Sequence, residues 1–101
     1  MGLFKDSINL GLQYTFLINL GFKYGERSGA QGETGYTKTI QHNDGYETLW
    51  ITVNPQERKV YLYNEWDCGG ELWQREYDIP QSKLGSESEF VDWLDEKIGD
   101  D

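Results

Sequence analysis

The stretch ETLWITVNPQERKVYLYN, residues 47–64, decides the fold, because it has the pattern of two strands joined by a tight turn. An aliphatic side chain stands at every second position on each side of the turn: Leu49, Ile51, Val53, Val60 and Leu62. This two-residue period is typical of strands with one buried face. Residues 54–57, Asn-Pro-Gln-Glu, interrupt the period, and proline presets the backbone angle of a turn. The stretch therefore predicts strands over residues 47–53 and 58–64.

The residues between these aliphatic positions are mostly aromatic. Trp50, Tyr61 and Tyr63 are predicted to lie on the opposite face of the sheet. A further predicted strand, residues 71–78, adds Trp73 and Tyr77 to one face or the other. Two interpretations remain open: helices cover the faces of the sheet, or an aromatic face is exposed for protein recognition, because Trp and Tyr dominate interface hot spots.

Two more turn signals extend the strand pair into a meander. Residues 36–40 form a predicted short strand, and residues 42–45, His-Asn-Asp-Gly, follow it with a strong tight-turn signal. Residues 67–70, Asp-Cys-Gly-Gly, lead into the strand at 71–78, which Pro80 ends because proline lacks the ladder donor. The sequence predicts an antiparallel meander of about four strands.

Helices are predicted on both sides of the meander. Residues 4–20 carry an apolar side chain every four residues, typical of a helix that Gly21 ends, although residues 15–18 also fit a strand. Ser86 and Glu89 have the spacing of a capping box, and apolar residues at helical spacing continue from there to residue 98. The predicted fold class is α+β: an N-terminal helix, the meander, and a C-terminal amphipathic helix packed on the sheet.

Residues 25–35 contain four glycines and no apolar anchor. Their spacing is neither the dinucleotide-binding fingerprint nor a phosphate-binding P-loop, because no Gly-Lys-Ser/Thr follows. We expect a mobile hairpin connection that could become ordered on contact with a partner.

Length and cysteine content place the chain in a broad class. The 101 residues are expected to form one domain, residues 1–101. The single cysteine, Cys68, excludes an internal disulfide, and with no recognisable signal peptide it favours a cytoplasmic location. No apolar run approaches the roughly 20 residues that span a membrane.

The net charge of −9 is concentrated in one part of the chain. Acidic and basic residues balance over residues 1–64, whereas residues 65–101 carry twelve acidic residues against Arg75, Lys83 and Lys97. This asymmetry indicates an interaction surface. It also disfavours direct binding to nucleic acid or anionic lipid, because both repel a negative protein.

The acidic third supplies the candidate partner-binding residues. Glu89, Asp92 and Glu96 share one side of the predicted final helix, since they are three and four residues apart. The full set of predicted partner-binding residues combines carboxylates with aromatic anchors: Glu65, Asp67, Glu71, Glu89, Asp92, Asp95, Glu96, Trp50, Trp66 and Trp73. We expect them to bind a basic protein surface, of which a nucleic-acid-binding enzyme is the most natural example.

In size and charge the chain resembles small acidic inhibitors of nucleic-acid enzymes, including some phage-encoded anti-CRISPR and anti-restriction proteins. This likeness implies an inhibitor or nucleic-acid mimic, but it rests on no family motif. The expected function is a non-enzymatic interaction protein without cofactor or metal. One alternative is a structural or assembly subunit that uses an aromatic sheet face.

A second alternative is a small hydrolase or metal-dependent enzyme. Its candidate residues would be His42 and Cys68, the only imidazole and thiol, with Glu65 and Asp67. Acidic neighbours raise a thiol pKa, which opposes activation of Cys68. Glu65, Asp67 and Glu71 offer oxygen ligands for a hard cation, but the spacing of an EF-hand loop is absent. We therefore predict no catalytic residues.

Overall fold

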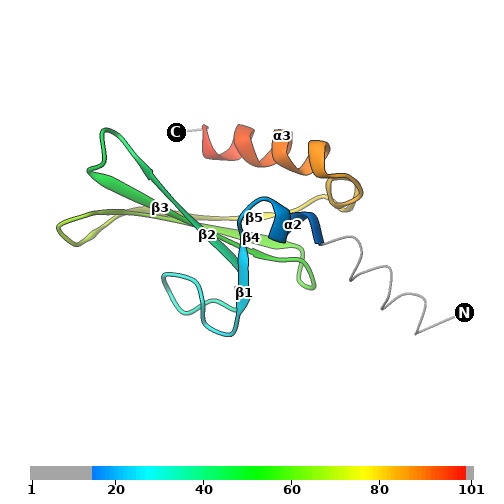
Figure 1. Ribbon diagram of the computed structural model, residues 1–101, viewed down its shortest axis with the longest axis horizontal. Helices are drawn as coiled ribbons and strands as arrows, with labels where there is room; N and C mark the ends of the chain where they lie inside the picture. The colour runs from blue at the N-terminus through cyan, green and yellow to red at the C-terminus, as the bar shows by residue number, and fades with distance from the viewer. Residues whose placement is uncertain (1–14, 100–101) are drawn as a thin grey trace, which may run out of the picture.

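A computed structural model describes residues 15–99 as two layers, a sheet with helices on one side (Figure 1). The elements follow in the order α2 (Thr15–Asn19), β1 (Lys23–Gly25), β2 (Gly35–His42), β3 (Glu47–Asn54), β4 (Lys59–Trp66), β5 (Glu71–Asp78), a 3-10 turn (Gln81–Leu84) and α3 (Glu87–Ile98). The five strands pair antiparallel in sequence order. The α+β class and the meander are thereby confirmed.

The register of the strands sorts their side chains onto two faces. Ile51 pairs with Leu62, Val53 with Val60, and Leu49 with Asn64. We call the face that carries these residues the covered face, because α3 lies along it (Figure 1). Trp50 pairs with Tyr63 and Thr52 with Tyr61 on the opposite side, which we call the open face. The predicted separation of aliphatic from aromatic side chains is confirmed for strands β3 and β4.

The hydrophobic core lies between the covered face and the helices. Its buried members come from α2 and the turn after it, the strands, the segment after β5 and α3: Phe16, Leu17, Phe22, Leu49, Ile51, Val53, Val60, Leu62, Ile79, Leu84, Phe90, Trp93 and Leu94. Trp73 and Tyr77 of β5 belong to this face, since they pair with Asn64 and Val60. Large aromatic rings thus supply much of the buried area in this small domain.

The helix α3 begins as the capping pattern predicts. The Ser86 hydroxyl oxygen accepts a hydrogen bond from the Glu89 backbone N–H at 3.2 Å, and Gly99 caps the other end. Phe90, Trp93 and Leu94 turn toward the sheet, and the Phe90 ring lies 5.5 Å from that of Phe16 in α2. One face of α3 is therefore buried and the other is free.

The predicted turns form with left-handed backbone conformations. Asn43 and Asp44 have φ values of 52° and 59° in the connection between β2 and β3. Short polar side chains tolerate this conformation better than most others, which explains the residues found here. Arg58 adopts φ 55° at the end of the turn before β4. It therefore precedes the strand rather than opening it.

The structure differs from the sequence prediction in two places. The sheet has five strands rather than about four, because Lys23–Gly25 adds β1 by pairing with residues 35–37 of β2. Three residues, the last of which is a glycine, carry too little alternation to signal a strand. Of the helix predicted over residues 4–20, the structure describes Thr15–Asn19 as helical, and the part before residue 15 lies outside the described residues.

The glycine-rich segment after β1 folds under the open face (Figure 1). The Ser28 hydroxyl donates to the Gly35 carbonyl oxygen at 3.0 Å and lies 3.0 Å from the Thr37 hydroxyl. A Cβ on Gly29 would stand 2.6 Å from the Thr52 Oγ1 atom, so a side chain there would push the loop off the sheet. The predicted hairpin connection is thus also a close contact with the open face.

Candidate partner-binding surfaces

The outer side of α3 carries a group of four exposed carboxylates. Glu89, Asp92, Asp95 and Glu96 are all exposed. Among residues 15–99, none of these four side chains forms a hydrogen bond or an ion pair. Lys97, the only basic residue of α3, points to the sheet, with its Nζ atom 5.4 Å from the Tyr77 ring centre and 6.0 Å from that of Trp93. The outer side of the helix is therefore uniformly negative.

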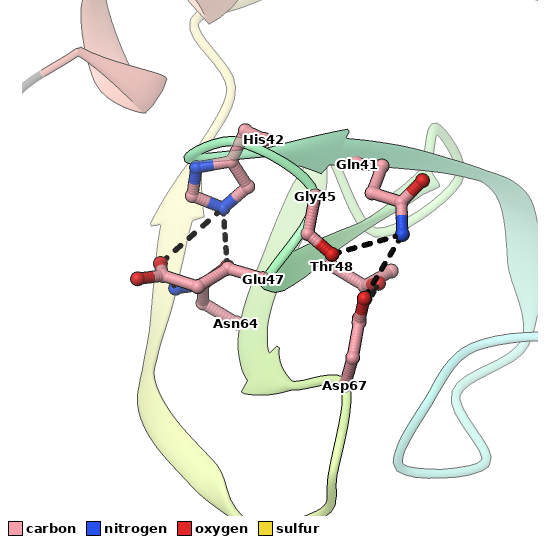
Figure 2. A network of polar contacts seen from close by, with 7 residues as sticks. All are labelled: Gln41, His42, Gly45, Glu47, Thr48, Asn64 and Asp67. Atoms are coloured by element: carbon pink, nitrogen blue, oxygen red, sulfur yellow. Dashed lines mark hydrogen bonds and ion pairs between the residues drawn. The ribbon is translucent and has the colours of Figure 1, made fainter.

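The predicted acidic residues near the β4–β5 connection have intramolecular partners. Asp67 accepts hydrogen bonds from the Gln41 amide at 2.9 Å and from the Thr48 hydroxyl at 2.8 Å (Figure 2). Glu65 accepts from the Trp50 indole N–H at 3.0 Å. Glu71 is exposed at the start of β5, opposite Glu65 in the register. Asp67 and Glu65 therefore hold this end of the sheet together.

The structure does not bring all predicted carboxylates onto one surface. Glu65 lies on the open face with Trp50, whereas the carboxylates of α3 lie on the outer side of the helix that packs on the covered face. The sheet separates the two groups. Sequence reasoning grouped them because they are neighbours in the chain, and the register that separates them is a tertiary property.

The three predicted tryptophan anchors are also divided. Trp50 lies on the open face, half-buried. Trp66 is the last residue of β4. It pairs with Glu47, lies on the covered face and is 43% exposed. Trp73 packs against the core, with the Arg75 guanidinium 4.4 Å from its ring centre. Only Trp66 is strongly exposed, so the three side chains do not form one anchor set.

A buried polar cluster that sequence reasoning missed lies at the end of the covered face. Asn64 has no exposed surface, and its Oδ1 atom lies 2.6 Å from the His42 Nε2 atom (Figure 2). The Asn64 amide donates to a Glu47 carboxylate oxygen at 2.8 Å, which is the main reason that the pKa of Glu47 lies below its ordinary value. Because an amide Oδ1 only accepts, His42 must carry its proton on Nε2. The alternation of Val60 and Leu62 extends to Asn64, so its burial could have been predicted.

The candidate catalytic residues lie in different settings. The His42 ring is bonded to Asn64 and lies 3.6 Å from a Glu47 carboxylate oxygen. Cys68 is an exposed free thiol in the β4–β5 connection, and no hydrogen bond joins it to His42. Within the described part of the chain, no group of three His, Cys, Asp or Glu side chains is placed to hold a metal ion.

The open face contains a groove of about 330 Å³ between the sheet and the glycine-rich loop. Its lining combines aromatic, hydroxyl, amide and carboxylate side chains with backbone: Ala30, Glu33, Trp50, Thr52, Tyr61, Leu62, Tyr63, Gln74, Arg75 and Glu76. Leu62 and Arg75 belong to the covered-face register, so they reach this groove through their backbone. The groove is a second candidate surface, on the side of the sheet opposite α3.

No protein-family model matches this chain, and comparisons with curated proteins and with solved structures find no match either. In residues 15–99 no helix is long and apolar enough to cross a membrane. The chemistry of the surfaces described above is therefore the basis for assigning a function.

Proposed function

We propose that this protein is a non-enzymatic interaction protein that binds a basic protein partner through the outer side of α3. One observation supports this proposal above the others: four exposed carboxylates share that side of the helix without a counter-ion among the described residues. A positively charged surface would supply the missing counter-ions. The two predicted acidic residues with intramolecular partners, Glu65 and Asp67, have a secondary role in this proposal.

The carboxylates of α3 beyond its first turn do not stabilise the helix, whereas Glu89 lies in the first turn, where the helix dipole favours a negative charge. Glu89, Asp92 and Glu96 stand three and four residues apart, a spacing at which like charges repel by a few tenths of a kcal/mol, roughly, per pair. Asp95 and Glu96 also lie near the negative end of the helix dipole. The repulsion between these carboxylates lowers local stability, and a role in binding or in solubility explains why the charges are present.

The partner that best fits this surface is a protein with a phosphate-binding groove. Carboxylates at regular spacing on a rigid helix can occupy sites built for a nucleic-acid backbone, and charge complementarity raises the association rate. We therefore propose an inhibitor or nucleic-acid mimic that acts on a nucleic-acid-handling enzyme. The one cysteine fits a reducing cytoplasm, where such enzymes work.

Affinity capture from a lysate of the native cells tests this function. The test variant carries Glu89→Gln, Asp92→Asn and Glu96→Gln, and the matched control carries Glu26→Gln, Asp44→Asn and Glu57→Gln. Both variants raise the net charge by the same three units, but only the first changes α3. At low salt we expect the wild type and the control to retain a basic protein that the α3 variant loses.

Salt dependence provides an independent criterion. An acidic helix that binds a basic groove should lose most of its partner between low and high salt, because mobile ions screen exposed charges. Retention that is the same for both variants and at both salt concentrations would contradict the function proposed for α3.

An assembly role through aromatic contacts is the second candidate. Several large side chains are strongly exposed: Tyr24 at 60%, Tyr46 at 65%, Trp66 at 43% and Ile40 at 37%. A complex built on these residues would persist or strengthen in high salt. Sedimentation of the purified protein at both salt concentrations separates this role from the first, because Trp66→Ser would then disrupt the assembly and the α3 variant would not.

A further inference from the structure

Aromatic side chains line the groove on the open face without ring contacts to one another. Trp50 and Tyr63 are direct cross-strand partners, and Tyr61 is the next residue on the same side of β4. Cross-strand aromatic pairs commonly stack in antiparallel sheets. No ring contact joins these three half-buried residues, which are all described, and all three line the 330 Å³ groove.

The charged side chains around the groove are mainly negative. Glu33 from the glycine-rich loop and Glu76 from β5 belong to the lining, and the Glu65 carboxylate is hydrogen-bonded to the Trp50 indole beside it. Among residues 15–99, no lysine belongs to the lining. The side chain of Arg75 lies on the other face of the sheet, with its guanidinium over Trp73. Burial, followed by the nearby Glu57 and Glu76 carboxylates, raises the pKa of the Tyr61 hydroxyl, in agreement with a negative environment.

Lys59 is a basic residue beside the groove, and carboxylates of β5 bind it. Lys59 is two residues from Tyr61 on the same side of β4, and its Nζ atom lies 2.9 Å from Glu76 and 2.8 Å from Asp78. Glu76 is the member of these ion pairs that lines the groove, whereas Lys59 and Asp78 are not part of the lining. A cation from outside would therefore find no basic side chain of the described residues paired with the Glu33 carboxylate, whose Oε2 atom accepts a hydrogen bond from the Gln31 backbone N–H at 3.0 Å.

We propose that this groove binds an arginine side chain presented by a partner protein. A guanidinium group is flat, always charged and weakly hydrated, so it stacks on aromatic rings and bonds to carboxylates at the same time. Trp50, Tyr61 and Tyr63 supply the rings, and Glu33 supplies the carboxylate acceptor, since Glu76 is already paired with Lys59. The site goes beyond the function proposed for α3, because it lies on the opposite side of the sheet and needs none of the carboxylates of the helix.

The glycine-rich loop gives this site its outer wall. Ser28 is tied to Thr37, whose hydroxyl lies 3.2 Å from that of Thr52 on the floor of the open face. The absence of a side chain at Gly29 lets the loop approach Thr52. Glu33 follows four residues later, and the Gly29 backbone N–H donates to its carbonyl oxygen at 3.1 Å. The loop therefore places one carboxylate above the aromatic floor.

NMR titration of the full chain tests the site with three synthetic pentapeptides, Gly-Gly-Xaa-Gly-Gly with blocked ends, in which Xaa is arginine, lysine or citrulline. The Trp50 indole N–H is the reporter, because it lies beside the groove. We expect the arginine peptide to shift this signal with an affinity severalfold above that of the lysine peptide, which has equal charge. The citrulline peptide, which has the same shape without charge, should cause no saturable shift. Tyr61→Leu and Glu33→Gln should each weaken arginine binding, the first by about tenfold.

The α3 variant described above is the matched control. It should bind the arginine peptide as the wild type does, because the helix is on the other side of the sheet. Equal responses to arginine and citrulline, or arginine shifts confined to α3, would overturn the groove proposal. Neither result would affect the lysate test of α3, so the two proposals fail independently. The peptide comparison uses the wild type, so it remains decisive if Tyr61→Leu does not fold.

Discussion

The two faces of the sheet use aromatic residues in opposite ways. Over the covered face, Phe90 has no exposed surface and lies within ring-contact distance of Phe16 and Trp93. On the open face, Trp50 and Tyr63 are cross-strand partners that make no ring contact and line a groove. The same class of side chain thus serves packing on one face and leaves accessible surface on the other. Composition alone does not separate these uses, because the register and the helices decide which face is buried.

The largest expected effect comes from removing a ring on the covered side. Phe90→Ala should lower the free energy of unfolding by about 3–5 kcal/mol, because it leaves a cavity in a closely packed core. The matched change on the open face, Tyr63→Ala, should cost about 1 kcal/mol or less, the value of a cross-strand contact. Denaturant unfolding followed by circular dichroism measures both. Equal losses would show that the open face contributes to the core after all.

The next largest effect concerns the buried amide of Asn64. Asn64→Leu removes its hydrogen bonds with His42 and Glu47 and should lower the free energy of unfolding by about 1–2 kcal/mol. Asn54→Ala is the control, since Asn54 makes its hydrogen bonds in an exposed turn and should cost less than about 1 kcal/mol. A stability gain in Asn64→Leu would mean that an apolar residue suits the site better and that the polar cluster is kept for another purpose.

A smaller effect is expected from acid at the edge of the open face. The hydrogen bond and charge of Lys59 lower the pKa of Asp78, so the folded protein holds this carboxylate ionised more strongly than the unfolded chain does. The resulting stability is complete above the ordinary carboxyl pKa of about 4 and is lost as the pH falls through the lower, folded value. Lys59→Met removes this contribution.

Urea midpoints of wild type and Lys59→Met at pH 7 and pH 3 measure this effect. The difference between the two proteins should be largest at pH 7 and should shrink at pH 3. A difference that does not change with pH would assign the role of Lys59 to its packing against the sheet.

The smallest effect on stability is expected on the outer side of α3. Neutralising Asp92 and Glu96, which are four residues apart, should raise the free energy of unfolding by a few tenths of a kcal/mol, roughly, because like charges on neighbouring turns repel. Thermal unfolding at low salt measures the change. A clear loss of stability would mean that these carboxylates support the fold, which would weaken the case for a role in binding.

Local patterns in the sequence predicted the elements that carry them. The alternation in β3 and β4 and the Ser86 cap of α3 were confirmed, because they depend on neighbours along the chain. Strand β1 was missed, since three residues become a strand only by pairing with β2. The glycines of the loop were interpreted as a source of flexibility, whereas Gly29 permits a close approach to Thr52 that only the folded chain reveals.

The candidate site was less accessible to sequence reasoning for the same reason. The exposure of Glu89, Asp92, Asp95 and Glu96 could be predicted, because a helix places residues three and four apart on one side. The partners of Glu65 and Asp67 could not, since Trp50, Gln41 and Thr48 reach them across strands. Whether a carboxylate is free or engaged depends on such long-range contacts.

The most direct test of the function proposed for α3 is the salt dependence of affinity for the basic protein captured by the wild type. Dissociation constants would be measured by calorimetry at several salt concentrations for the wild type, the α3 variant and its charge-matched control. We predict that the control keeps the affinity and the salt slope of the wild type, whereas the α3 variant loses at least tenfold in affinity, roughly, at low salt and has a shallower slope. Identical curves for all three proteins would contradict the assignment of binding to the outer side of α3.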